Sequence, residues 1–264
     1  MASRYIVGID LGTTNTAVSF LDSSVEDAAP QAFSIPQITQ AGERDEQATL
    51  PSFVYLPDAN DVAAGQLDLP WAGNRDFSVG AFARKQASSQ PGKTISSAKS
   101  WLCASNVDRM APILPWNRNN PDRQLSPVQA AQRILEHIRE SWNATMAADD
   151  PDAKLQFQDL ILTVPASFDV VARDLTVKAA EAAGLQVTLL EEPQAAFYSW
   201  LQDRGDQWRD SIEAGDLILV CDLGGGTTDF SLIEVIDEGG NLSLQRLAVG
   251  DHILLGGDNM DLTL

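Results

Sequence analysis

One short pattern occurs twice in this chain, and each copy requires a strand, a tight turn and a second strand. The first copy is "IVGIDLGTTNTAVSF", in which Asp10 follows an apolar run. The second is "LILVCDLGGGTTDFSL", in which Asp222 lies 212 positions further along the chain. Apolar β-branched runs of this length predict buried strands, and the glycines and threonines predict turns. The sequence therefore predicts two similar β-hairpins, each with an aspartate at the end of its first strand.

Both turns carry residue types that suit phosphate binding. Glycine lets a backbone approach a ligand closely, and successive N–H groups of a turn form an anion-binding nest. The glycines are Gly12, Gly224, Gly225 and Gly226, and the threonines, which add hydroxyl donors, are Thr13, Thr14, Thr227 and Thr228. An aspartate beside phosphate is repelled unless a cation lies between them, and Mg²⁺ commonly bridges carboxylates to substrate phosphates. Asp10 and Asp222 are therefore predicted to face one Mg²⁺ from opposite sides.

Composition excludes several classes of protein. The 264 residues include 37 acidic and 18 basic side chains, a net charge of −19. This excess argues against general binding to nucleic acid or to anionic membranes, since both require a basic face. Two cysteines are too few for a secreted disulfide scaffold, and Cys221 is expected to be buried in its strand. No signal segment or membrane-length apolar run is visible, so we expect a cytoplasmic protein without a membrane span.

The remaining segments mix predicted strands and helices, which indicates an α/β fold. The clearest helix lies within residues 125–148, where Ser126 is a good N-cap and Pro127 suits the first turn. Its His137 is expected at the surface or its boundary. Residues 23–48 and 58–77 are polar and are expected to be irregular. Further strands are predicted at 5–9, 16–22, 51–57, 159–165, 186–193, 216–222, 227–237 and 242–249, and further helices near 78–88, 95–102, 169–183 and 193–203.

The two hairpins resemble the two phosphate motifs of the actin-like ATPase superfamily, which includes actin, sugar kinases and the 70-kDa heat-shock chaperones. Other segments are similar to the chaperone branch and keep its order. They are "TLPSFVYL" at 49–56, "SSAKSWL" at 96–102, "LTVPASFD" at 162–169, "AGLQVTLLEEPQAAFYSWL" at 183–201 and "LLGGDNMD" at 254–261. The chain thus resembles a divergent member of the 70-kDa heat-shock chaperone family, over the N-terminal part of its nucleotide-binding domain only.

The resemblance implies an actin-like ATPase fold, of the ribonuclease H-like type, with two related lobes of mixed sheets flanked by helices. Residues 1–213 would form lobe I, and about 38–125 of them would form its smaller subdomain. Residues 214–264 would begin lobe II, which we expect to be truncated and therefore incomplete. The segment at 58–77 is expected to be an insertion.

The resemblance also implies the site residues. Gly12, Thr13, Thr14, Asn15, Gly224, Gly225, Gly226 and Thr227 would bind the phosphates of ATP or ADP, with Gly256 and Gly257 near the nucleotide. Asp10 and Asp222 would hold Mg²⁺ through water. The catalytic residues would be Lys99 at the γ-phosphate, Glu192 and Asp229 at the attacking water, and Thr227. Pro165 and Arg173 match positions that relay the nucleotide state to a partner domain.

The implied function is an ATP-binding and ATP-hydrolysing module whose nucleotide state is coupled to a substrate-binding region outside this chain. Its expected partners are nucleotide, that region, and co-chaperones or an exchange factor. The alternatives are a nucleotide-dependent actin-like assembly protein, a small-molecule kinase of the same superfamily, or a degenerate site that only binds. The chain departs from the family pattern at Glu191, where the family usually has asparagine. An added carboxylate there is expected to alter the surroundings of the site.

Overall fold

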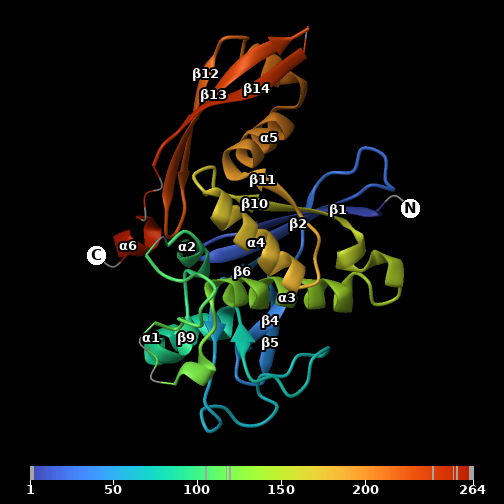
Figure 1. The fold of residues 1–264 in the computed structure, drawn as a ribbon. Coiled ribbons are helices and arrows are strands. Elements are labelled where there is room, and N and C mark those ends of the chain that lie inside the picture. The colour runs from blue at the N-terminus through green and yellow to red at the C-terminus, as the bar shows by residue number, and fades with distance from the viewer. Residues whose placement is uncertain are drawn as a thin grey trace. The chain divides into compact units, whose positions relative to one another are not determined.

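The computed structural model describes residues 3–104, 106–116, 118, 120–239, 241–251, 253 and 255–261 (Figure 1). The chain divides into two compact units. The first consists of Met1–Leu162 and Val170–Thr188, and the second of Thr163–Asp169 and Leu189–Leu264. The lobe boundary between residues 213 and 214 stays a prediction, because compact units and the lobes of a family fold are different divisions.

The first predicted hairpin forms the middle of the main sheet in the first unit. β1 (Tyr5–Leu11) pairs with β2 (Asn15–Asp22) in antiparallel fashion and with β10 (Asp159–Val164) in parallel fashion. β3 (Gln31–Ala32) and β6 (Thr49–Pro51) both pair with β2. Alternate residues of β1 are buried, as expected for a strand with one face in the core.

Helices α3 (Pro127–Thr145) and α4 (Val170–Ala182) pack against each other in the first unit (Figure 1). The predicted start of α3 is confirmed: Ser126 and Gln129 form a reciprocal capping box, and Pro127 occupies the first turn. The buried face of α3 includes Trp142, whose ring lies against Tyr5 of β1 and Phe20 of β2. The chain after α4 turns at Gly184, where φ is +76°.

Residues 23–48 were expected to be irregular, and that prediction is wrong. Three strands lie there, including the hairpin of β4 (Ile35–Gln40) and β5 (Glu43–Gln47). Its inner residues are Ile35 and Ile38, which are buried, whereas β5 is almost entirely exposed. A strand made of charged residues gives no apolar alternation, so the pattern on which sequence prediction depends is absent.

The other elements of the first unit are short. They are β7 (Val54–Tyr55), β8 (Ser78–Val79), α1 (Ala81–Ser89), β9 (Thr94–Ile95) and α2 (Ala98–Leu102), with single 3-10 turns at Pro91–Lys93, Pro121–Arg123, Pro151–Ala153 and Leu155–Phe157. The two helices confirm the predictions near 78–88 and 95–102, with shifted starts. β7 pairs with both β8 and β9.

The segment at 58–77 forms a loop, as predicted, but it is packed onto the unit. Leu67 and Leu69 are buried in a cluster with Ile38, Tyr55 and Phe82. Trp71 Nε1 donates to Glu140 of α3, and the Arg75 guanidinium forms an ion pair with the same carboxylate. This packing also covers His137, which is 1 % exposed instead of lying at the surface.

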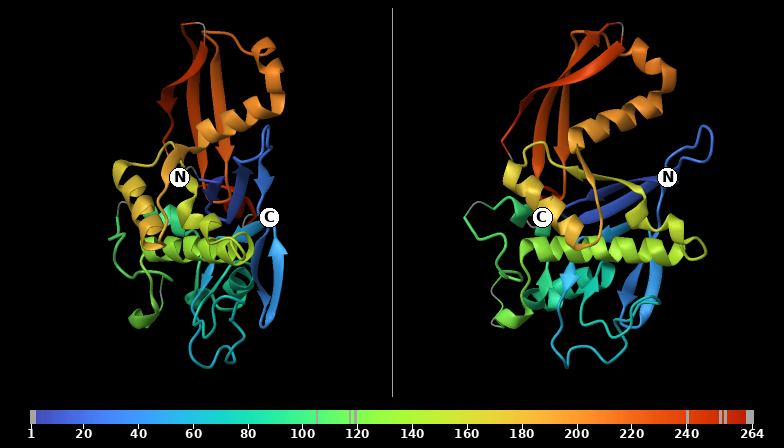
Figure 2. Two further views of the ribbon diagram at one scale, coloured as in Figure 1. Left: turned by 90° about the vertical axis from the view of Figure 1, so that its right-hand side faces the viewer. Right: turned by 45° about the vertical axis from the view of Figure 1, so that its right-hand side comes forward.

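The second unit contains an antiparallel sheet in the order β12 (Leu217–Leu223), β13 (Thr228–Glu238) and β14 (Asn241–Val249). β11 (Thr188–Glu191) leads directly into α5 (Glu192–Arg204), which runs beside this sheet in both views of Figure 2. A 3-10 segment at Gly205–Asp210 and the short α6 (Gly257–Asp261) complete the unit.

The prediction that Cys221 is buried is wrong. Leu217, Leu219, Cys221 and Leu223 are all exposed, and they share one face of β12. The apolar run "LILVC" therefore belongs to a strand whose alternate side chains are uncovered within the described part of the chain. Among the described helices, none combines the length and the apolar character that crossing a bilayer requires.

Candidate functional site

The first hairpin has its predicted turn between Leu11 and Asn15. Asp10 is exposed near the end of β1 and pairs in register with Ala17. A side chain at Gly12 would bring its Cβ to 2.3 Å from the backbone oxygen of Asn15, so only glycine fits this turn. Because no side chain covers the backbone at Gly12, this tight turn can approach an anion closely.

The segment "TLPS" at 49–52 braces this turn. Ser52 N–H donates to the carbonyl of Thr14 at 2.9 Å, and Ser52 Oγ donates to the carbonyl of Gly12 at 2.7 Å. Because Ser52 Oγ is already a donor, the 3.0 Å contact with Thr16 Oγ1 has Thr16 as its donor. Thr16 and Ser52 are buried, so the bonds hold the loop in one backbone conformation.

The second hairpin repeats the geometry of the first. Asp222 pairs in register with Asp229, just as Asp10 pairs with the residue seven positions after it. Its turn is closed by a hydrogen bond of 2.9 Å from Gly224 N–H to the carbonyl of Thr227. The sequence repeat is thus a structural repeat, with each aspartate at the same distance from its turn.

Gly256 and Gly257 lie against the second hairpin. Gly257 N–H donates to the carbonyl of Gly224 at 3.0 Å, and Thr228 Oγ1 donates to the carbonyl of Leu255 at 2.8 Å. A Cβ on Gly256 would lie 2.5 Å from two backbone oxygens of the turn. The two glycine segments therefore pack backbone to backbone, which larger residues prevent.

Asp229 is 3 % exposed and accepts a 2.6 Å hydrogen bond from Ser167 Oγ. Ser167 belongs to the loop that follows β10, two residues after the buried Pro165. Sequence reasoning did not select Ser167, although it lies inside the "VPASFD" segment that marked the resemblance. A hydroxyl that donates to a buried carboxylate both satisfies it and fixes its orientation.

The second predicted carboxylate, Glu192, is the first residue of α5 and is followed by Pro193. The residue before it, Glu191, forms an ion pair with Arg246 of β14. Arg246 was also missed, because nothing in its own segment marks a functional residue. Its ion pair with Glu191 places it beside the start of α5.

The predicted site residues divide between the two units. The first unit contains Asp10, Gly12, Thr13, Thr14, Asn15, Lys99 and Arg173. The second unit contains Pro165, Glu192, Asp222, Gly224, Gly225, Gly226, Thr227, Asp229, Gly256 and Gly257. Lys99 is partly exposed in α2, between the buried Ala98 and Leu102. Each unit thus holds one hairpin with its aspartate.

No group of three or more His, Cys, Asp or Glu side chains in the described part of the chain is arranged to hold a metal ion. The metal role of Asp10 and Asp222 stays a prediction. The two hairpins instead offer single carboxylates, hydroxyls and backbone N–H groups. Such donors suit a hydrated Mg²⁺ that is held mainly by phosphate and water.

Comparison with known proteins places the chain in a family. The family model for Hsp70 protein matches residues 71–264. The chaperone protein HscA of Xenorhabdus nematophila is 31% identical over 99% of this chain and 37% of its own length. HscA of Klebsiella pneumoniae is 33% identical over 98% of this chain and 36% of its own length. DnaK of Buchnera aphidicola is 28% identical over 97% of this chain and 36% of its own length.

The chain thus spans little more than a third of the length of these relatives, whereas nearly all of the chain itself is matched. The matched region includes the second glycine hairpin, the start of α5 and the segment at Gly256 and Gly257. On this match, the chain belongs to the Hsp70 family.

Proposed function

We propose that this chain binds ATP and ADP with Mg²⁺ and forms part of an ATPase that transfers the γ-phosphoryl group to water. The observation that carries the proposal is the structural repeat, in which Asp10 and Asp222 precede two glycine turns of the same register. The Gly12 turn, which a Cβ would fill, fits a phosphate, and carboxylate oxygens fit Mg²⁺. Membership of the Hsp70 family supports the same reading.

In this proposal the chain supplies position and charge, since phosphoryl transfer requires little covalent help. The turn residues Gly12–Asn15 and Gly224–Thr227 hold the phosphate oxygens, and Thr227 adds a hydroxyl at the reacting group. The Lys99 ammonium neutralises charge that develops on the γ-phosphate. Glu192 and Asp229 orient the attacking water or accept its proton. Mg²⁺, when bound through water to Asp10 and Asp222, would neutralise the phosphate oxygens.

The wider role that we propose is that of a chaperone-like protein in the cytoplasm. The nucleotide state would be relayed through Pro165 and Arg173 to a substrate-binding region outside this chain. Co-chaperones or an exchange factor would control the rate of the nucleotide cycle. The relatives named above are chaperone proteins, and they are longer than the chain. Residues 1–213 and 214–264 would belong to the two lobes that clamp the nucleotide.

Calorimetric titration of the full-length protein with ATP tests the binding part of the proposal. We expect Asp222→Asn to weaken binding in the presence of Mg²⁺ by about 10- to 100-fold, the usual effect of losing an outer-sphere contact. Without Mg²⁺ the same substitution should not weaken binding, because the lost carboxylate would only repel the phosphates. Asp251→Asn is the matched control, because Asp251 is an exposed aspartate of the same unit. Equal affinities of wild type and Asp222→Asn in Mg²⁺ would contradict the metal role.

Single-turnover hydrolysis tests the role of Lys99. We expect Lys99→Ala to lower the rate of the chemical step by roughly 10²- to 10³-fold, as the loss of one preorganised charge-stabilising donor does at other sites. The affinity for ATP should fall far less. Lys85→Ala is the control, since Lys85 is an exposed lysine of the same unit whose ammonium donates to the Thr39 carbonyl. A similar loss in both variants would remove Lys99 from the site.

A further inference from the structure

The junction between β11 and α5 differs from an ordinary helix start. Glu191 occupies the N-cap position, with φ −72° and ψ 134°, yet its side chain makes no hydrogen bond to the first turn of α5. Asparagine is among the best N-capping residues, and glutamate is not. The start of α5 therefore lacks the local side-chain cap that asparagine would provide.

The Glu191 carboxylate is directed instead to a different strand. It forms an ion pair with the guanidinium of Arg246, in which Arg246 Nη1 donates to Glu191 Oε1. The Glu191 side chain is 15 % exposed and that of Arg246 is 44 % exposed. Arg246 lies on β14 opposite Ile233 of β13. The pair therefore links the beginning of α5 to the β13–β14 ladder.

The start of α5, which carries Glu192, lies close to Asp229, the second predicted catalytic carboxylate. A cavity of about 10 Å³ is lined by Glu191, Gln194, Ser231 and Arg246, among others, so the first turn of α5 lies over Ser231. Ser231 and Asp229 are alternate residues on one buried face of β13, about 7 Å apart along the strand. The Ser231 hydroxyl is buried and has no hydrogen-bond partner within the described part of the chain.

We infer that Arg246 is a positioning residue for hydrolysis. Through Glu191 it holds the first turn of α5, and hence Glu192, at a fixed place relative to the strand that carries Asp229. The inference rests on the proposed function, in which these two carboxylates orient the attacking water. The pair with Arg246 thereby fixes the start of a helix that has no side-chain cap of its own. A displacement of about 1 Å at a reacting group is enough to cost up to roughly 100-fold in rate.

A partly exposed ion pair contributes little to folding, so the expected effects separate position from stability. In the full-length protein we expect Arg246→Gln to lower kcat for ATP hydrolysis by about 10-fold, with KM and the thermal midpoint nearly unchanged. Arg246→Lys should keep most of the activity, because it retains the charge. Gln245→Ala is the control, since Gln245 is the exposed neighbour of Arg246 in β14.

A second background makes the test specific. Glu191→Asn supplies a local cap, so this variant should stay within about twofold of wild type and should no longer depend on Arg246. We therefore expect Arg246→Gln to lower kcat in the wild-type background and to have no effect in the Glu191→Asn background. An equal loss of kcat in both backgrounds would overturn the positioning role. So would a loss of kcat that is accompanied by a lower thermal midpoint of unfolding.

The outcomes also distinguish this inference from the function on which it rests. A wild-type protein that neither binds nor hydrolyses ATP would overturn both. A wild-type protein that hydrolyses ATP at the same rate as Arg246→Gln would overturn the inference and leave the proposed function intact.

Discussion

Replacement of Trp142 by alanine is expected to lower the free energy of unfolding of the first unit by about 3–5 kcal/mol, the usual cost of removing a large aromatic side chain from a core. The Trp142 side chain is fully buried. Its ring centroid lies 5.5, 5.3 and 5.2 Å from those of Tyr5, Phe20 and Phe33. The substitution therefore removes the contact at which β1, β2 and α3 meet.

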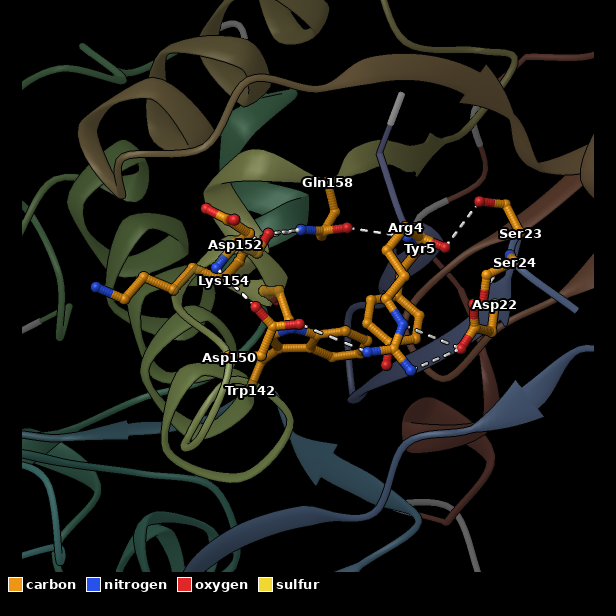
Figure 3. Close-up of polar contacts among 11 residues, drawn as sticks. Arg4, Tyr5, Asp22, Ser23, Ser24, Trp142, Asp150, Asp152, Lys154 and Gln158 are labelled. Atoms are coloured by element: carbon orange, nitrogen blue, oxygen red, sulfur yellow. Dashed lines mark hydrogen bonds and ion pairs between the residues drawn. The ribbon is translucent and has the colours of Figure 1, made fainter. Parts of the chain in front are cut away.

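Hydrogen bonds around Trp142 also fix the segment that leads into β10. Trp142 Nε1 donates to the carbonyl of Ala153 at 2.9 Å. Figure 3 shows the neighbouring polar contacts: Arg4 lies between Asp22 and Asp150, and Gln158 accepts from Tyr5 N–H while donating to the carbonyl of Asp152. Loss of the indole leaves the Ala153 carbonyl without this donor, which adds to the cavity cost.

Chemical denaturation followed by far-UV circular dichroism measures this effect. Phe157→Ala is the matched control, because Phe157 is an aromatic residue of the same unit that is 59 % exposed. We expect the control to change the unfolding free energy by less than about 0.5 kcal/mol. If Trp142→Ala were no more destabilising than Phe157→Ala, the described packing of α3 on the sheet would be wrong.

Acidification is expected to destabilise the first unit through His137. Burial, together with the nearby Arg75 guanidinium, lowers the pKa of His137 from 6.5 to about 4, although the hydrogen bond to the Pro36 carbonyl opposes this shift. Its ring is held neutral, with Nε2 at 2.9 Å from the Pro36 carbonyl as a donor. At pH values above 6.5 the ring is neutral in both states. As the pH falls toward 4, only the unfolded chain takes up the proton, which costs about 3 kcal/mol of stability between pH 7 and pH 4.

Comparison with His137→Gln isolates this contribution, because both proteins contain the same acidic residues. We expect the variant to be less stable at pH 7, since the histidine contact with Pro36 is lost. Between pH 7 and pH 4.5, the difference in unfolding free energy between the two proteins should shrink by about 2.4 kcal/mol. Denaturation curves at pH 7, 5.5 and 4.5 measure it. A difference that stays constant with pH would show that His137 is accessible to protons in the folded state.

The sequence is sufficient where structure depends on local chemistry. The α3 start follows from Ser126 and Gln129, which satisfy each other within one turn. Both hairpins follow from an apolar run, an aspartate and a glycine turn, and the structure gives them one register. Gly256 was implied only by the resemblance of its segment to the family, and its backbone contact with the second turn accounts for the glycine.

Where a residue's environment depends on contacts with residues far away in the chain, the local sequence pattern gives no prediction or a wrong one. His137 has the pattern of a boundary residue and becomes buried because the 58–77 loop packs over it. Cys221 has the pattern of a buried strand residue, yet its face of β12 is exposed. Ser167 and Arg246 acquire their roles only from contacts with Asp229 and Glu191, 62 and 55 positions away in the chain.

The central claim is that the two hairpins serve one Mg²⁺–nucleotide site, and a double-mutant cycle of Asp10→Asn and Asp222→Asn tests it most directly. Calorimetry would give the Mg²⁺-dependent affinity of the full-length protein and its three variants for ATP. If both aspartates hold the same ion, each single variant loses about 10- to 100-fold in affinity and the double variant loses little more than the weaker-binding single variant. Losses that multiply in the double variant, or an effect confined to one aspartate, would show that the two hairpins do not share one ion.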